Sequence, residues 1–278
     1  MKRVITIVAS IVFMACVNVA IGQSAHGNKL CQFYNIDKTV KAKLGEGEEA
    51  IIQRNSIKAL WPVLLNGKEC PRLQEKFCLW MTGKEDIKQL DRAIEEMLYT
   101  DNESVPFGEG VKYRLLDGFD EEALPISSYA CTIELQSMGN RFALFHLLSN
   151  MYFAGAAHGM YSHNYITYDT ELDKIVTLED VLLDPELIRP LILESIVTEY
   201  DYTEENLFLP EDNLPPVPSV FFFENGLLHL VYQAYEIASF AQGTIDVPIY
   251  YTDDDNAPEF FTPYGKEVMK ESLGDDLY

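Results

Sequence analysis

Residues 131–153 read CTIELQSM-GN-RFALFHLLSNMYF, and this segment predicts the centre of the fold. Two apolar runs flank Gly139-Asn140, a residue pair that suits a tight hairpin turn. Counting back from a two-residue turn places His146 opposite Ile133, on an apolar face of the sheet. A histidine in that position usually belongs to the core or its rim.

A second hairpin is predicted over residues 219–233, where Asn225-Gly226 separates two apolar runs. Asn-Gly favours a two-residue turn because both residues tolerate a positive φ. This turn places Phe222 opposite His229. Further strands are expected at residues 56–65, 164–168, 174–177 and 245–251.

Helices are predicted between these strands. Thr82 and Glu85 have the spacing of a capping box, and the apolar residues that follow predict a helix over residues 85–99. Thr177 and Asp180 cap a helical turn in the same way, and a longer helix is expected after Asp184. Hairpins and helices without regular alternation indicate an α+β fold with a mostly antiparallel sheet.

The N-terminus has the layout of an export signal. Lys2 and Arg3 precede an apolar run, and Ala20 and Gly22 provide small residues before a cleavage point. We therefore expect a signal peptide over residues 1–22 and a mature protein that begins at Gln23. The expected location is periplasmic or extracellular.

Two alternatives to cleavage at Gly22 stay open. Cys16 follows an alanine and could be the lipidated residue of a lipoprotein, which would anchor the protein in the outer envelope. The apolar run could instead remain as an anchor, although Asn18 interrupts it. No other apolar stretch reaches about 18 residues, so no membrane span is expected after signal cleavage.

The composition is that of a folded, strongly acidic protein. The 278 residues are 47% hydrophobic and carry a formal net charge of −23. This charge argues against nucleic acid and against anionic membrane surfaces, and it favours cationic partners. The alternative is that the acidic surface serves solubility alone.

Four cysteines follow the signal, at Cys31, Cys70, Cys78 and Cys131. An even number in an oxidising compartment favours disulfides, and four cysteines allow three pairings. Cys70 and Cys78 are close enough to close one loop, and Cys31 with Cys131 would form the other bridge. The alternative is that some are free buried thiols. No Cys-x-x-Cys pair occurs, so no metal site is predicted.

Three segments are expected along the chain: the signal peptide, an N-terminal α+β domain over residues 23–125, and a strand-rich domain over residues 126–278. Residues 23–47 are polar and predict a tether with one short strand near residues 30–34. A loop containing proline and glycine at residues 101–110 precedes the expected boundary.

Residues 155–159 read GAAHG and contain the first candidate site, His158 and Gly159. Small residues on both sides allow the backbone to turn tightly around the imidazole. One hypothesis is a metal or acid–base site formed with His163 and Asp169. The alternative is that His158 holds a loop or contacts a ligand.

Residues 235–243 read YEIASFAQG and contain the second candidate site, Tyr235, Glu236 and Gly243. Glu236 could act as a general base with His158, which would make the protein a cell-envelope hydrolase. More often such a carboxylate caps a turn. The sequence lacks a nucleophile elbow, a phosphate loop and a dinucleotide pattern, so no cofactor is predicted.

Both sites lie in motifs that resemble a bacterial extracytoplasmic domain family of unknown function. Residues 152–159, YFAGAAHG, resemble the family's Tyr-x-Gly-Gly-Ala-His-Gly, and residues 174–180, KIVTLED, resemble its Lys-x-Leu-x-Leu-x-Asp. Residues 235–248 resemble its Tyr-Glu-Ile-Ala-Pro-Tyr-Ala-x-Gly…Ile-Pro. The family includes the outer domain of RsiV, a lysozyme-binding anti-sigma factor. Trp61-Pro62 is similar to a Tyr-Pro pair of the domain that usually precedes this one, as it does in PdaC, a peptidoglycan deacetylase.

The resemblance implies a non-catalytic envelope binding module whose ligand is a lysozyme-like protein or a cell-wall glycan. Its ligand contacts would include His158, Gly159, Tyr235, Glu236 and Gly243. Only three residues precede the apolar run, so no part that could hold a sigma factor is expected, and no deacetylase domain is expected either. Signalling and deacetylation are therefore not expected to carry over. The sequence also departs from the family pattern at Ala156 and Ser239, which replace a glycine and a proline.

Overall fold

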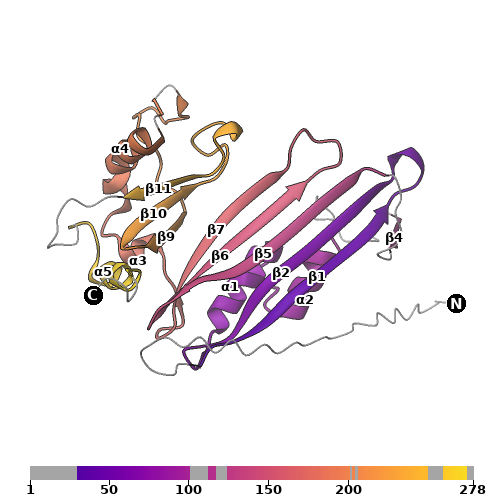
Figure 1. Cartoon of the computed structure of the whole chain (residues 1–278), viewed down its shortest axis with the longest axis horizontal. Coiled ribbons are helices and arrows are strands. Elements are labelled where there is room, and N and C mark those ends of the chain that lie inside the picture. The colour runs from indigo at the N-terminus through magenta and orange to yellow at the C-terminus, as the bar shows by residue number, and fades with distance from the viewer. Residues whose placement is uncertain are drawn as a thin grey trace.

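The computed structural model describes residues 30–100, 112–116, 124–200, 202–203, 206–249 and 259–273. The predicted α+β class is confirmed: a large sheet is covered by helices on one face, and a smaller sheet packs beside it with further helices (Figure 1). The expected signal peptide and Cys16 lie outside the described residues. In the described ranges, no helix combines the length and the apolarity that a membrane crossing requires.

The large sheet has eight strands, and seven of them follow the order β4-β1-β2-β5-β6-β7-β8, with β3 paired to β2. All neighbours are antiparallel except β2 and β5. The strands are β1 (Gln32–Leu44), β2 (Ile51–Leu65), β3 (Lys68–Glu69), β4 (Tyr113–Leu115), β5 (Ile126–Met138), β6 (Phe142–Tyr152), β7 (Met160–Asp169) and β8 (Lys174–Ile175).

The parallel pair requires a crossover, and helices α1 (Pro71–Thr82) and α2 (Leu90–Leu98) form part of it. Both helices cover the same face of the large sheet (Figure 1). The predicted capping box is wrong, because Thr82 is the last residue of α1 and its hydroxyl donates to the carbonyl of Cys78 at 2.8 Å. Gly83, with φ of +66°, ends α1, and α2 begins at Leu90 instead of residue 85.

Alternating side chains on the strands create two different faces. Ile57, Cys131 and Phe145 point toward α1 and α2 and are fully buried with Phe77 of α1. The Phe145 ring meets the Phe77 ring edge-on, with 5.2 Å between their centroids. The helix-facing side is therefore the main core of the molecule.

The predicted hairpin at residues 131–153 is present, but its register differs. Met138 pairs with Ala143, so the loop is longer than two residues, and a bulge follows between Leu135 and Ser137. His146 consequently lies opposite Glu134 and not opposite Ile133. The extra loop residues and the bulge shift the pairing, and such a shift changes which side chains share a face.

The predicted tether at residues 23–47 is wrong for the described part, because residues 32–44 form the long strand β1. β1 pairs with β2 along its whole length, and strand alternation places Thr39 and Lys41 on the face that α1 and α2 leave open. The expected boundary at residue 125 falls between β4 and β5, and strands from both sides of it share the large sheet.

The smaller sheet has the order β11-β10-β9, from β9 (Val220–Glu224), β10 (Leu227–Tyr232) and β11 (Ile245–Ile249). The Asn225-Gly226 hairpin is confirmed, with φ of +50° and +77° at the turn and Phe222 opposite His229. The capping box of Thr177 and Asp180 is also confirmed. It starts α3 (Leu178–Val181), which packs in one core with this sheet, α4 (Arg189–Tyr200) and α5 (Pro263–Glu271).

The predicted disulfides are not formed: Cys31, Cys70, Cys78 and Cys131 are free thiols. Cys70 is the N-cap of α1 and Cys78 lies eight residues further on, which separates their Cα atoms by about 12 Å along the helix axis. A disulfide spans at most about 7 Å between Cα atoms. Burial raises the pKa of the Cys70 thiol to about 12 and that of the Cys131 thiol to about 11, so both remain protonated.

Candidate functional site

The two predicted site motifs lie on loops that meet at one end of the molecule. Residues 153–159 connect β6 to β7, and residues 233–244 connect β10 to β11. Gln233 joins the loops to β7: its side-chain oxygen accepts from the backbone N–H of His163 and its amide donates to the carbonyl of His163, both at 2.8 Å. The side chain thereby satisfies backbone groups on the edge of β7 as a neighbouring strand would.

Phe240 is the centre of a group of rings that we call the aromatic cluster: His158, Tyr161, Tyr235 and Phe240. The His158 imidazole stacks on the Phe240 ring with 3.8 Å between centroids and an angle of 18°. Tyr235 and Tyr161 lie 5.5 Å and 6.0 Å from the same ring. Because His158 and Tyr235 are exposed, the cluster presents ring faces to solvent.

Tyr235 has an unusual backbone conformation. Its φ is +73°, in the left-handed region that a bulky side chain rarely adopts. Glu236 stabilises this turn, because its carboxylate accepts from the Gln233 N–H at 2.6 Å and its own N–H donates to the Gln233 carbonyl at 3.1 Å. Strained residues of this kind concentrate at ligand-binding positions, and here the strain directs a 52%-exposed ring into the aromatic cluster.

The two glycines of the motifs allow the loops to pack closely. Gly243 has φ of +71°, and a Cβ at this position would lie 2.9 Å from the Tyr161 hydroxyl oxygen. A Cβ on Gly159 would lie 3.0 Å from the carbonyl oxygen of Met151 on β6. The left-handed φ of Gly243 favours glycine there, and a side chain at position 159 would crowd the β6 backbone.

The sequence hypothesis of an acid–base or metal site is not supported. His158 Nδ1 hydrogen-bonds to the carbonyl of Gly159 at 3.0 Å. His163 bonds to His146, and Asp169 lies at the other end of β7, about 20 Å from His163 along the strand. No hydrogen bond joins His158 to Glu236 within the described ranges, and no described group of His, Cys, Asp and Glu has the arrangement of a metal site.

A row of stacked rings runs from the cluster into the interface of the two sheets. His163 stacks on His146 at 5.1 Å, and His146 stacks on Tyr165 at 4.7 Å. Tyr165 stacks on Phe222 at 4.2 Å, and Phe222 stacks on His229 at 4.6 Å. Burial lowers the pKa of both His146 and His163, which favours the neutral imidazoles. The rings therefore connect β6 and β7 to β9 and β10.

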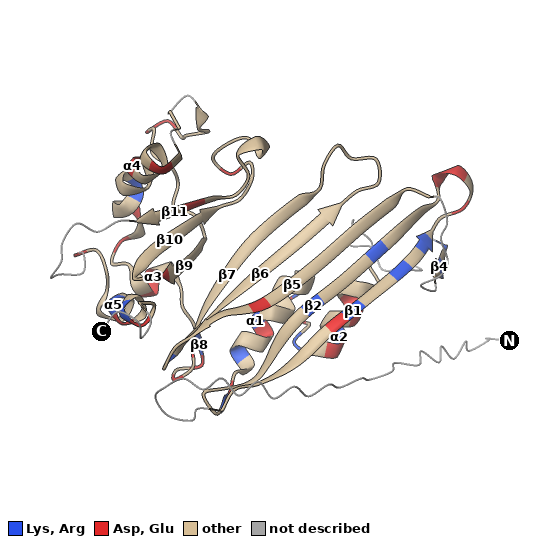
Figure 2. Ribbon diagram, viewed as in Figure 1, with Lys and Arg blue, Asp and Glu red and all other residues tan. Residues whose placement is uncertain are grey.

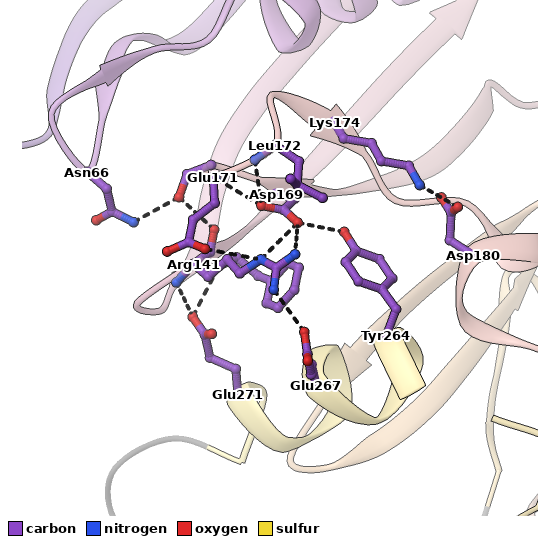
Figure 3. Close-up of polar contacts among 12 residues, drawn as sticks. Asn66, Arg141, Asp169, Glu171, Leu172, Lys174, Asp180, Tyr264, Glu267 and Glu271 are labelled. Carbon is purple, nitrogen blue, oxygen red and sulfur yellow. Dashed lines mark hydrogen bonds and ion pairs between the residues drawn. The ribbon is translucent and has the colours of Figure 1, made fainter. Parts of the chain in front are cut away.

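A polar network fixes α5 to the opposite end of β6 and β7 (Figure 3). The Arg141 guanidinium donates to the fully buried Asp169 carboxylate from Nε at 2.9 Å and from Nη2 at 2.7 Å. The Tyr264 hydroxyl of α5 donates to the same carboxylate at 2.8 Å. Glu267 pairs with Arg141 at 2.8 Å, and Glu271 accepts from the backbone N–H groups of Arg141 and Phe142. This network borders a groove of about 810 Å³ between the hairpin and α5.

The sequence pointed to the loops of the site but not to the rings that complete it. Phe240 lies inside the YEIASFAQG motif, whose other apolar residues gave it no distinct signal. Tyr161 and Gln233 had no signal, because their roles depend on the packing of β7 against the β10–β11 loop.

Comparison with known proteins finds similarity in fold alone. No protein-family model matches the chain, and no curated protein matches its sequence. A DUF3298 family member from Bacteroides fragilis superposes with a TM-score of 0.61 at 15% identity, over 87% of this chain and 97% of that one. A DUF3298 family protein from Pseudomonas aeruginosa superposes with a TM-score of 0.51 at 15% identity, over 84% of this chain and 95% of that one. The chain therefore has the fold of these DUF3298 proteins over most of its length.

Proposed function

We propose that this protein is a non-catalytic binding module of the cell envelope, and that the aromatic cluster binds a cell-wall glycan. The observation that carries this proposal is the stacking of exposed His158 on Phe240 beside the strained, exposed Tyr235. Sugar rings have apolar C–H faces that pack on aromatic rings, while polar groups around the rings orient the hydroxyls. The expected export signal and the resemblance to RsiV and PdaC support a location in the envelope.

Binding is favoured over hydrolysis by the way the two proposed catalytic side chains are engaged. Glu236 caps the turn that holds Tyr235, and His158 is stacked and bonded to its own loop. A general base must reach the proton that it removes, and neither group is directed at the other. Both side chains are instead placed to shape a rigid surface.

Calorimetric titration with N-acetylglucosamine oligomers and soluble peptidoglycan fragments tests the proposal. We expect binding by the wild-type protein, and at least about a tenfold loss in Phe240→Ala and in Tyr235→Ala because each removes a stacking face. Tyr34→Ala is the control, since Tyr34 is a comparably exposed aromatic residue on β1. Absence of wild-type binding at about 1 mM ligand would overturn the glycan proposal.

A lysozyme-like protein is the second candidate ligand, because a net charge of −23 would attract a basic partner. The resemblance to the outer domain of RsiV supports the same choice. Association with lysozyme should then be detectable at low salt and weaken as salt rises. No association at about 100 µM in low salt would exclude this candidate.

A further inference from the structure

Among the residues that the structure describes, none covers the face of the large sheet turned away from α1 and α2 over β1 and β2 (Figure 1). The smaller sheet contacts the β6–β7 side, where Leu144 and Tyr165 pack against Val220 and Phe222. We call the rest of this surface, formed by β1, β2, β5, the C-terminal half of β6 and the N-terminal half of β7, the open face. Strand alternation places Arg54 and Lys58 on it, and both are exposed.

The open face carries cations in an otherwise acidic protein. Lys41 of β1 lies directly opposite Arg54 of β2, and Lys58 lies four residues further along the same face. Figure 2 shows basic residues on β1 and β2, whereas β5, β6 and β7 contain no lysine or arginine, and β5 places the exposed Glu134 on this face. Like charges directly opposite one another destabilise a sheet, so this pair has a cost for folding.

No carboxylate forms an ion pair with Lys41 or Arg54 in the described part of the chain. None of Lys41, Arg54 and Lys58 forms an ion pair there. Asp37 lies opposite Lys58, but the cross-strand row of Lys41 and Arg54 continues into Ser128 without any acidic residue. A cationic pair without a counter-charge is suited to an anionic ligand.

The open face leads from these cations to the aromatic cluster. One cross-strand row contains hydrogen-bonding and small residues and ends in a member of the cluster: Thr39, Ser56, Ala130, Asn150 and Tyr161. Four strand spacings separate β1 from β7, a distance of about 19 Å. An extended ligand can therefore contact the rings at one end and the cations at the other.

We infer that the open face binds a carboxylate-bearing glycan strand, which extends from the aromatic cluster to Lys41 and Arg54. This inference rests on the proposed glycan-binding function and specifies the class of glycan. Sugar rings stack on the cluster, hydroxyls bond to the serine, threonine and asparagine side chains, and carboxylates pair with the two cations.

The test compares two oligosaccharides of equal length: neutral N-acetylglucosamine oligomers, and oligomers in which alternate sugars carry a lactyl carboxylate. We expect the carboxylated oligomer to bind wild-type protein at least tenfold more tightly in low salt. The double variant Lys41→Gln/Arg54→Gln should lose this preference and retain the affinity for the neutral oligomer. Lys76→Gln, on the exposed side of α1, should keep the preference.

The outcomes separate this inference from the proposed function. Equal affinities for the two oligomers in the wild type would overturn the carboxylate site and leave glycan binding intact, whereas no binding of either would overturn both. The double variant should melt at the same or a higher temperature than the wild type, because it removes the like-charge contact. A lost preference in a protein with an undiminished melting temperature can then be assigned to the ligand and not to unfolding.

Discussion

The Arg141 guanidinium and the Asp169 carboxylate form a two-point hydrogen bond at the junction of the large sheet and the C-terminal helix. The carboxylate also accepts from the hydroxyl of Tyr264 and from the backbone N–H groups of Glu171 and Leu172. One fully buried acidic group thus joins the ends of β6 and β7 to α5.

Asp169→Asn should destabilise the protein by about 3 kcal/mol, because it removes the charge that pairs with Arg141 in a buried setting. Urea unfolding followed by circular dichroism measures the change. Glu267→Gln is the matched control. Glu267 contacts the same guanidinium but its side chain is 60% exposed, so this substitution should lower the unfolding free energy by less than about 1 kcal/mol. Equal effects of the two substitutions would contradict the central role of Asp169.

Acid should weaken the same network. Burial alone raises the pKa of Asp169, but the hydrogen bonds from Arg141 and Tyr264 outweigh it and leave the pKa below its ordinary value. A carboxyl with a depressed pKa contributes stability above the pKa of the unfolded chain, about 3.9, and loses it as the pH falls further. We expect the unfolding free energy to drop below about pH 4, and to drop less in Asp169→Asn.

The paired histidines His146 and His163 should make the unfolding free energy depend on pH in a second, higher range. His146 Nε2 and His163 Nδ1 are 2.9 Å apart, and both pKa values are lowered by burial, that of His146 also by His163. The neutral pair is stabilised, so its contribution is complete above about pH 6.5 and declines as the pH falls below it. Urea midpoints at pH 7.5 and 5.5 should differ less in His146→Gln than in wild type.

Gly265→Ala should loosen α5 from α3. A Cβ at this position would lie within 2.3 Å of the Val181 carbonyl oxygen, a backbone atom that cannot turn aside. Alanine normally favours a helix over glycine by about 1 kcal/mol, so the sign of the effect is informative. We expect a loss of about 1–3 kcal/mol from overpacking, measured by thermal unfolding. A stabilised variant would show that α5 is not packed this closely.

The cysteines should differ sharply in reactivity. In a chain that begins at Gln23, Cys31 is the one partly exposed thiol, while Cys70, Cys78 and Cys131 are buried. Burial raises the pKa of Cys78 and of Cys131 to about 11, which further suppresses the reactive thiolate. Titration with a chromogenic disulfide should detect one fast thiol in the folded protein and four after denaturation. A count of two or fewer after denaturation without reductant would indicate a disulfide instead.

Some of the fold could be predicted because it depends on neighbouring residues. Asn225-Gly226 turns the chain through its own backbone preferences, and the turn alone sets Phe222 opposite His229. Thr177 and Asp180 form their capping box three residues apart for the same reason. The loops of the candidate site were likewise marked by glycines that allow close approach, at Gly159 and Gly243.

Other features depended on residues distant in the chain. The bulge that turns His146 toward Glu134 and the pairing that makes β1 a strand come from the sheet as a whole, and their sequences carry no local signal.

The turns of the chain follow from single residues and short spacings, because backbone preferences are local. The contact of Phe240 with His158 and the pairing of Lys41 opposite Arg54 depend on the folded arrangement of distant segments. These contacts join segments brought together by the burial of apolar surface, which is non-directional and therefore not encoded in any one stretch of sequence.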